Sequence, residues 1–242
     1  MLAQLLRALA PGAPLVALAP KDRGGSRLGK ELAAFGCEVT ETARRHHRIC
    51  RTLRPEAPVG LDEAIAAGAP RLHEGLWTWP GVFSWKRVDP GSALLAAGLP
   101  TLVGDGADLG CGIGVLAHAV LASPRVKSLA LIDIDRRAIE CARRNVNDPR
   151  VTFAWADALQ PQPGMADLDF IVCNPPFHEN GAENRRLGQD FIRRAHGMLR
   201  RGGTLHLVAN RHLPYETILA ELFAGVTPLA DSGGFKVLEA KR

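Results

Sequence analysis

Two short motifs hold the residues of this chain whose types and spacing could do chemistry. The first is the glycine-rich run Asp108-Leu-Gly-Cys-Gly-Ile-Gly114, and the second is Asn174-Pro-Pro-Phe177. Glycine lets the backbone approach a ligand without a Cβ in the way, and a helix that starts after such a run offers free N–H groups to an anion. The second motif can hold a planar amine through an amide side chain and an aromatic ring.

The glycine-rich run lies between the apolar residues 99–103 and 115–121, so it predicts a strand, a turn and a helix. A dinucleotide-binding fingerprint would need its third glycine at position 115, which is Val115. The pattern therefore favours S-adenosylmethionine, which has no pyrophosphate and would place its carboxylate at the helix start. A glycine turn without a ligand is the alternative. The residues predicted to bind the cofactor here are Asp108, Gly110, Gly112 and Gly114, with Asp108 attracting the ammonium group or a water beside it.

Acidic residues follow the next two predicted strands. Asp133 comes directly after the apolar run 128–132, where a carboxylate can accept hydrogen bonds from a ribose hydroxyl pair. Asp135 is expected to cap the next helix. Asp157 follows the predicted strand 150–155 and is placed to accept a hydrogen bond from the adenine amino group, with an ordinary loop acid as the alternative.

The second motif directly follows a predicted buried strand at residues 168–173. Its two prolines fix the backbone after that strand. A ring amine is a poor nucleophile because its lone pair is delocalised, and two carbonyl acceptors for its hydrogens would free the lone pair. We expect the Asn174 side chain and the Pro175 main chain to be these acceptors, and Phe177 to stack on the ring. Asn174 would also lie beside the cofactor.

With these residues in view, the part of the chain from about residue 81 to 242 resembles the bacterial 16S ribosomal RNA guanine-N2 methyltransferases, and more broadly the methyltransferase small domain family. The motifs that carry the resemblance are Val82-Phe-Ser84, Asp89-Pro-Gly-Ser92, the two motifs above, Val208-Ala-Asn-Arg-His-Leu-Pro-Tyr215 and Gly234-Phe-Lys-Val237. It implies an S-adenosylmethionine-dependent N-methyltransferase with ribosomal RNA as its partner. It also implies base recognition by Asn174, Pro175 and Phe177, and cofactor binding by Asp108, Gly110, Gly112, Asp133 and Asp157.

The expected fold class is α/β, with a Rossmann-like seven-stranded class I methyltransferase domain after a small truncated α/β segment. The predicted parallel strands are 103–108, 129–133, 151–155, 169–173 and 204–209, and an antiparallel pair is predicted at 226–230 and 235–240. Ligands of such sheets bind at the carboxyl ends of the strands, at the switch point of the strand order. Both motifs therefore fall at one predicted site.

The N-terminal part is shorter than the degenerate methyltransferase-like domain that family members usually carry there. Its pattern predicts a strand at 14–19, a helix at 29–36 and a strand at 37–41, followed by a linker from 54 through 75 and a hinge near 79–81. We interpret residues 1–75 as a trimmed remnant with its linker, and residues 76–242 as the catalytic domain.

The net charge of +5 and the pI near 9.2 come with a local basic cluster. The cluster consists of Arg44, Arg45, His46, His47, Arg48, Arg51 and Arg54, and two further arginine pairs lie at 185–186 and 193–194. Basic surface beside an aromatic-bearing pocket is typical of proteins with a polyanionic substrate such as RNA. A solvated basic face is the alternative. His178, beside Phe177, is expected either to contact the substrate or to cap a turn.

The five cysteines lie at positions 37, 50, 111, 141 and 173 without a C-x-x-C pair, which favours reduced thiols in the cytoplasm over a disulfide framework or structural zinc. Cys111 and Cys173 are expected to pack at strand ends. No metal site is expected, and residues 1–19 do not predict a membrane helix.

Two other functions stay open: methylation of another amine, such as adenine or a protein glutamine, and a module that binds cofactor or RNA without catalysis.

Overall fold

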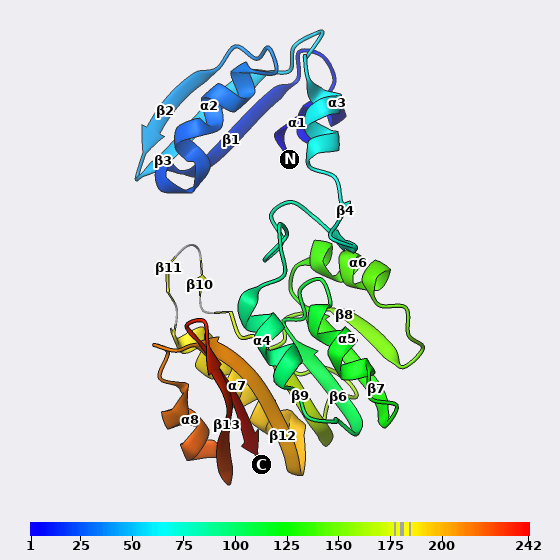
Figure 1. Ribbon diagram of the computed structural model, residues 1–242. Helices are drawn as coiled ribbons and strands as arrows, with labels where there is room; N and C mark the ends of the chain where they lie inside the picture. The colour runs from blue at the N-terminus through cyan, green and yellow to red at the C-terminus, as the bar shows by residue number, and fades with distance from the viewer. Residues whose placement is uncertain (177, 180–181, 184) are drawn as a thin grey trace. The chain divides into compact units, whose positions relative to one another are not determined.

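The computed structural model describes residues 1–176, 178–179, 182–183 and 185–242 (Figure 1). Contacts divide the chain into two compact units, Met1–Ala69 and Pro70–Arg242. The sequence-based boundary lies later, after residue 75, within a short hairpin of β4 (Arg71–His73) and β5 (Leu76–Thr78). None of the helices in the described ranges combines the length and apolar character that a bilayer crossing requires.

A seven-stranded sheet of order β13-β14-β12-β9-β6-β7-β8 forms the centre of the second unit. Its strands are β6 (Gly104–Leu109), β7 (Val126–Asp133), β8 (Val151–Trp155), β9 (Leu168–Cys173), β12 (Leu199–Asn210), β13 (Gly225–Ser232) and β14 (Phe235–Lys241). Neighbours from β12 to β8 pair in parallel, whereas β14 pairs antiparallel with both β12 and β13. The predicted Rossmann-like fold with an antiparallel edge pair is confirmed.

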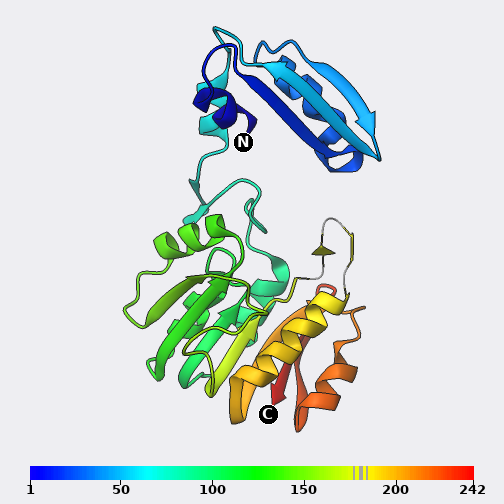
Figure 2. The same ribbon diagram turned by 180° about the vertical axis from the view of Figure 1, so that it is seen from behind.

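Helices cover both faces of this sheet. They are α4 (Pro90–Gly98), α5 (Val115–Leu121), α6 (Arg136–Asn145), α7 (Arg185–Met198) and α8 (Tyr215–Leu222). In Figure 1, α4 and α5 lie in front of the sheet. Figure 2 views the molecule from the opposite side, and there α7 lies in front of the sheet. Side chains of β9 alternate between two apolar cores: Phe170 and Val172 join the core under α4, α5 and α6, whereas Ile171 and Cys173 join the core under α7 and α8. A parallel sheet buried on both faces explains the continuous apolar runs of its strands.

The first unit is built around an antiparallel sheet of order β1-β3-β2. Its elements are α1 (Leu2–Ala8), β1 (Pro14–Pro20), the irregular turn η1 (Lys21–Gly25), α2 (Ser26–Ala33), β2 (Thr40–Arg44), β3 (His47–Leu53) and α3 (Leu61–Ala67). One core contains Leu6, Leu32, Cys50 and Leu61.

Two short strands of the second unit, β10 (His178–Glu179) and β11 (Ala182–Glu183), pair with each other after the Asn-Pro-Pro motif.

Three predictions for the first unit need correction. The helix expected at 29–36 begins at Ser26 and ends at Ala33, and the strand expected at 37–41 occupies Thr40–Arg44. The strand β3 was not predicted, because arginines lie on both of its faces and obscure the alternation of exposed and buried residues. Only Cys50 and Thr52 of this strand are buried. The linker expected from 54 through 75 contains α3, because Leu61 packs into the core of this unit.

Candidate active site

A pocket in the second unit is formed by three chain segments. One is the stretch from Phe83 to the start of α4, the second is the glycine-rich turn with the start of α5, and the third is Asn174 after β9. Gly110, Gly112 and Asn174 therefore lie together at this pocket, as predicted. The described residues that line it do not include the other predicted site residues, which are Asp108, Gly114, Asp133, Asp157 and Pro175.

The three predicted glycines of the turn have positive φ angles, which L side chains rarely adopt. A Cβ added to Gly112 (φ 54°) would meet no atom within 4 Å, so the turn leaves open space on that side. A Cβ on Gly114 (φ 86°) would lie 3.0 Å from Val146. Gly112 thus leaves room for a ligand, whereas Gly114 is required for the turn and for packing against the end of α6.

Asp133 connects the end of β7 to the glycine-rich turn. Its Oδ2 accepts a hydrogen bond from the Gly112 N–H at 2.8 Å, and its Oδ1 accepts one from the Asp135 N–H at 2.8 Å. Burial raises the pKa of Asp133, and these N–H groups counteract that rise. Each carboxylate oxygen has lone pairs beyond the bond it already accepts, so Asp133 can still accept hydrogen bonds from a ligand.

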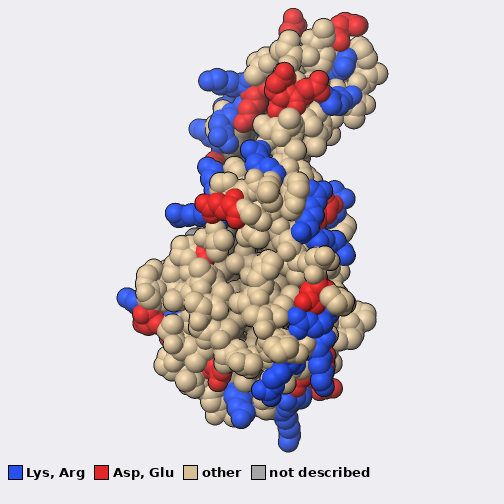
Figure 3. Space-filling model, turned by 45° about the vertical axis from the view of Figure 1, so that its right-hand side comes forward, with Lys and Arg blue, Asp and Glu red and all other residues tan. Residues whose placement is uncertain are grey.

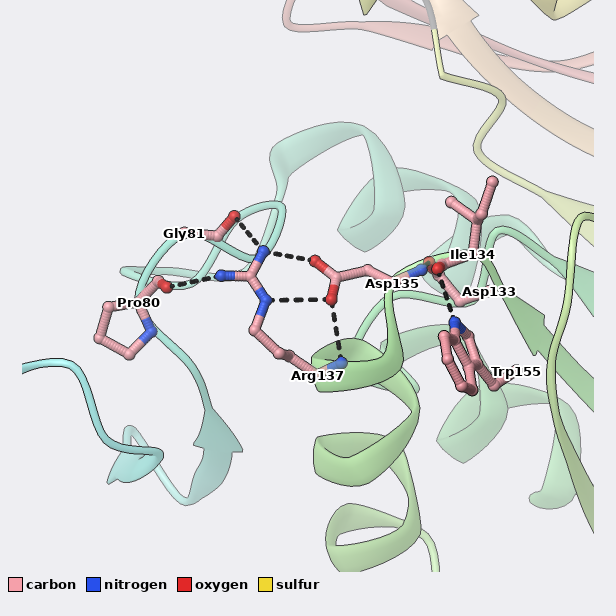
Figure 4. Close-up of polar contacts among 7 residues, drawn as sticks. All are labelled: Pro80, Gly81, Asp133, Ile134, Asp135, Arg137 and Trp155. Atoms are coloured by element: carbon pink, nitrogen blue, oxygen red, sulfur yellow. Dashed lines mark hydrogen bonds and ion pairs between the residues drawn. The ribbon is translucent and has the colours of Figure 1, made fainter. Parts of the chain in front are cut away.

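Asp135 caps α6, as predicted, because its Oδ1 accepts a hydrogen bond from the Arg137 N–H at 2.9 Å. The Arg137 guanidinium donates back to this carboxylate, with Nη2 at 2.7 Å from Oδ2 (Figure 4). It also donates to the main-chain oxygens of Pro80 and Gly81, at 3.3 and 3.4 Å. Arg137 has no role in the sequence-based predictions, although it ties the segment before the pocket to the start of α6. An arginine two residues after a helix cap was the available signal.

An exposed apolar surface lies next to Asp133. Ile134 is 70% exposed and Trp155 is 64% exposed, and the Trp155 indole donates to the Ile134 main-chain oxygen at 2.9 Å (Figure 4). This pairing orients the indole at the carboxyl ends of β7 and β8. Neither residue has a role in the sequence-based predictions, because a single large apolar residue at a strand end gives no signal of its exposure. Large exposed apolar side chains beside a polar site are typical of a ligand-binding surface.

Asp108 is fully buried at the end of β6. Within the described part of the chain, neither of its carboxylate oxygens has a hydrogen-bond partner. Burial, followed by the negative charge of Asp133, raises the pKa of Asp108 to about 8. A cation near the turn would favour the ionised form. The unpaired carboxylate and the open space at Gly112 therefore fit a zwitterionic cofactor whose ammonium group lies near β6.

Asp157 lies in the turn after β8 and is half-buried. Its Oδ1 accepts a hydrogen bond from the Leu159 N–H at 2.9 Å, which closes a local turn. No hydrogen bond joins it to the glycine-rich turn or to Asp133 among the described residues. The contacts of Asp157 are those of a turn residue, and its predicted role toward adenine stays a prediction.

Asn174 is held in one orientation by the start of α4. Its Nδ2 donates to Asp89 Oδ2 at 3.0 Å and to Ser92 Oγ at 2.9 Å. Asp89 also caps α4 by accepting the Ser92 N–H at 2.8 Å. Both amide hydrogens of Asn174 are thereby used, and its carbonyl oxygen is left to accept. The cap pattern Asp-Pro-x-Ser before an apolar run could have identified Asp89 and Ser92 as partners of the motif.

The remaining residues of the second motif follow Asn174 directly in the chain. Pro175 is buried and Pro176 is half-buried at the end of β9. Phe177 and the side chain of His178 lie outside the described residues, so the stacking and contact predicted for them stay predictions.

The two cysteines beside the motifs are packing residues. Cys111 and Cys173 are buried, and burial raises the pKa of each thiol well above its usual value. Cys173 donates to the Leu109 main-chain oxygen, with sulfur and oxygen 3.1 Å apart. A buried neutral thiol is a poor nucleophile. The described residues contain no group of three or more His, Cys, Asp or Glu suited to a metal ion.

The seven-stranded sheet, the glycine-rich turn after β6 and the Asn-Pro-Pro motif after β9 define a class I methyltransferase fold. The family model described as "Methyltransferase small domain" matches residues 74–239, and the chain belongs to this family.

Relatives and solved structures agree with this assignment. The chain is 31% identical to the ribosomal RNA small subunit methyltransferase C of Shewanella piezotolerans over 95% of this chain and 69% of that protein. It is 34% identical to the protein of the same name from Pseudomonas aeruginosa, over 98% and 73%. Its structure matches the T. thermophilus 16S rRNA N2 G1207 methyltransferase (RsmC), solved in complex with AdoMet and guanosine, with a TM-score of 0.79 and 27% identity, covering 100% of this chain and 68% of that one.

Proposed function

We propose that this protein transfers a methyl group from S-adenosylmethionine to the N2 amino group of a guanine in small-subunit ribosomal RNA. The observation that carries the proposal is the fixed amide of Asn174, whose carbonyl oxygen can only accept at a pocket shared with the glycine-rich turn. The names of the relatives support small-subunit ribosomal RNA as the substrate, and the name of the matched T. thermophilus structure supports the choice of guanine N2.

The amine is activated by acceptors and needs no ionised base. Asn174 Oδ1 and the Pro175 main-chain oxygen accept the two amine hydrogens, which draws the nitrogen toward tetrahedral geometry and frees its lone pair. When bound, S-adenosylmethionine supplies an electrophilic methyl group on a sulfonium. The amine nitrogen held by these two acceptors would take up that methyl group, with S-adenosylhomocysteine as the leaving group, and its surplus proton would pass to solvent. Positioning of this kind contributes up to about 7–11 kcal/mol in favourable cases.

The cofactor is held by the carboxyl ends of three adjacent strands. The open side of Gly112 takes the methionine part, and the buried Asp108 favours its ammonium group. Asp133 accepts the ribose hydroxyls while it holds the Gly112 N–H. Asp157 is assigned to the adenine amino group because it follows the next strand, β8. Asp133 is thus a ligand acceptor and a brace for the turn.

RNA is the proposed partner, and the basic side chains of the chain differ in how freely they can meet a phosphate. Figure 3 shows basic side chains interspersed with acidic ones on the surface of both units. In α7, Arg186 and Arg193 lie 3.9 and 2.9 Å from Asp190, which partly neutralises them. In the first unit, Arg44 and Arg51 point away from α2, whereas Arg48 pairs with Glu41. The open face of that sheet is therefore the better candidate for phosphate contacts.

The proposal is tested on ribosomal RNA from a strain that lacks this protein. We expect the purified protein and S-adenosylmethionine to produce N2-methylguanosine, detected by mass spectrometry of nucleosides after digestion of the small-subunit RNA. Naked RNA and assembled subunits are compared in parallel. The appearance of methylated adenosine, or of no methylated nucleoside with either substrate, would contradict the proposal.

The five cysteines are all free thiols, in keeping with a cytoplasmic setting for this reaction.

A further inference from the structure

Asn174 and Asp89 form neighbouring parts of one pocket wall. The Asn174 amide cannot turn over, because a carboxylate accepts hydrogen bonds and does not donate them. Asp89 Oδ2 must therefore face Nδ2 of Asn174, as it does at 3.0 Å. The opposite orientation would place two acceptor oxygens against each other. The Asn174 carbonyl oxygen is consequently fixed as an acceptor.

The Asp89 carboxylate is used unequally. Its Oδ2 accepts two hydrogen bonds, from the Ser92 N–H at 2.8 Å and from Asn174 Nδ2. Its Oδ1 receives no hydrogen bond from the part of the chain that the structure describes. The two donors on Oδ2 thus fix the rotation of the Asp89 carboxylate, and Oδ1 is left without a donor among the described contacts. Asn174 and Asp89 both line the pocket, their side chains are hydrogen-bonded to each other, and Asn174 Oδ1 and Asp89 Oδ1 receive no hydrogen bond in the described contacts.

Purines that carry an exocyclic amine differ in what lies beside it. Guanine has the N1–H next to its N2 amino group, so two neighbouring groups donate. Adenine has an acceptor, N1, next to its N6 amino group. A wall with two acceptors satisfies both groups of guanine and places a negative charge against N1 of adenine. Readout of a base through this edge requires that the base be unpaired or flipped.

We infer that Asp89 is the residue that selects guanine. Its Oδ1 accepts the guanine N1–H while Asn174 Oδ1 accepts an N2 hydrogen. The inference rests on the proposed function, because it concerns the same pocket and the same amine. A hydrogen bond to a charged acceptor is stronger than a neutral one, so losing it carries a measurable penalty. Asp89 would otherwise be only the cap of α4 and the support of Asn174.

Nucleoside binding separates these roles. Guanosine carries both donors, inosine keeps N1–H without the amine, and 2-aminopurine riboside keeps the amine with an acceptor at N1. We expect the full-length protein, with S-adenosylhomocysteine present to prevent turnover, to bind guanosine at least about tenfold more tightly than 2-aminopurine riboside. Inosine binding should be retained in part. Calorimetry measures all three, and the fluorescence of 2-aminopurine gives a second reading.

The decisive variant is Asp89→Asn. An amide caps a helix as well as a carboxylate does. The Ser92 N–H and Asn174 Nδ2 both donate, so they hold the oxygen of the introduced amide and leave its nitrogen at the position of Asp89 Oδ1. The variant should therefore prefer 2-aminopurine riboside over guanosine and lose inosine binding.

Ser92→Ala is the matched control. It removes one support of Asn174 but keeps the carboxylate, so the preference for guanosine should stay while methyl transfer slows. Thermal unfolding checks that both variants are folded. An unchanged ratio of guanosine to 2-aminopurine riboside affinity in Asp89→Asn, or no guanosine binding by the unaltered protein, would overturn the inference. Neither result concerns whether ribosomal RNA gains N2-methylguanosine, so the proposed function is judged separately.

Discussion

The two units of this chain each contain a β-sheet, but only the second unit covers its sheet on both faces. The parallel sheet of the second unit separates two apolar cores. The antiparallel sheet of the first unit has one core, and on its other face Val16, Leu18 and Leu53 are 58%, 63% and 61% exposed. Antiparallel sheets tolerate a solvated face, whereas parallel sheets with helical crossovers seldom do. The candidate active site lies in the unit whose sheet is covered on both faces, whereas the first unit has an exposed sheet face.

The residues of the basic cluster that lie in the first sheet are divided between its open face and its covered face. Strand alternation places Arg44 and Arg51 on the exposed face, opposite the side of Glu41. Glu41 lies against Gly29 of α2 and 3.4 Å from Arg48. The sheet thus divides a run that is uniformly basic in the sequence. Arg48 is paired with a carboxylate, whereas Arg44 and Arg51 have no carboxylate partner among the described contacts, and Arg51 donates to the Thr42 hydroxyl at 3.4 Å.

The largest effect is expected in the second unit for Asn174→Ala. The change removes the proposed acceptor of the amine without touching the glycine-rich turn, so kcat should fall on the order of 100- to 1000-fold, as for the loss of one preorganised polar group in other active sites. Cofactor affinity measured by calorimetry should stay unchanged. Full activity would mean that Asn174 only closes the end of β9.

A smaller effect is expected for Asp133→Ala. Asp133 braces Gly112 and is proposed to accept the ribose hydroxyls, so S-adenosylmethionine affinity should fall about 10- to 100-fold. The matched comparison is Asp157→Ala, whose carboxylate is bound only to its own turn in the described contacts and whose loss should cost less. Equal affinities of Asp133→Ala and the unaltered protein would remove Asp133 from the cofactor site.

Asp108 makes the stability of the cofactor-free protein dependent on pH. Its folded-state pKa of about 8 lies above that of an ordinary aspartate, so the folded state holds a proton that the unfolded state has lost. Stability from this group is present below about pH 4 and is lost as the pH rises toward 8. Urea unfolding at pH 5 and pH 8 should show Asp108→Asn losing less stability than the unaltered protein, by at least about 1.4 kcal/mol, the equivalent of one pKa unit. Identical losses would place the carboxylate in contact with water.

The smallest effect is expected in the first unit. Replacing Arg44 and Arg51 by alanine should flatten the dependence of RNA affinity on log salt by roughly 0.7 per lost phosphate contact, the value for single strands. Arg48→Ala is the matched control, because Arg48 is already paired with Glu41 and should change the slope less. Cofactor affinity should not change in either variant. Parallel slopes for all three proteins would show that the open face is only solvated.

The sequence predicts the second unit better than the first for a physical reason. Strands buried on both faces, such as Leu168–Cys173, are continuous apolar runs, and the turns between strands and helices carry glycine or aspartate. The strand His47–Leu53 has one buried face and arginines on both, so its pattern resembles a charged loop. Asp133 could be assigned from the sequence because it comes directly after a predicted strand, the next one after the glycine-rich run.

The partners of the site were harder to predict because they come from distant parts of the chain. Asp89 and Ser92 are more than eighty residues from Asn174 along the chain, and only the folded structure shows that they use both of its amide hydrogens. Arg137 reaches the main chain of Pro80 and Gly81 in the same way. Local patterns report caps and strands, whereas such long-range pairs depend on tertiary packing.

The small hairpin of β4 and β5 has a consequence for dissecting the chain. Asn145 at the end of α6 accepts from the Trp77 N–H at 2.6 Å and donates to the Trp77 main-chain oxygen at 2.9 Å, so β5 is fastened to the second unit. A piece cut where the family match begins, at residue 74, would lose β4 and leave the backbone of β5 unpaired along one edge. Gene fusions or domain exchanges made at residue 70, where the second unit begins, are therefore expected to keep the hairpin intact.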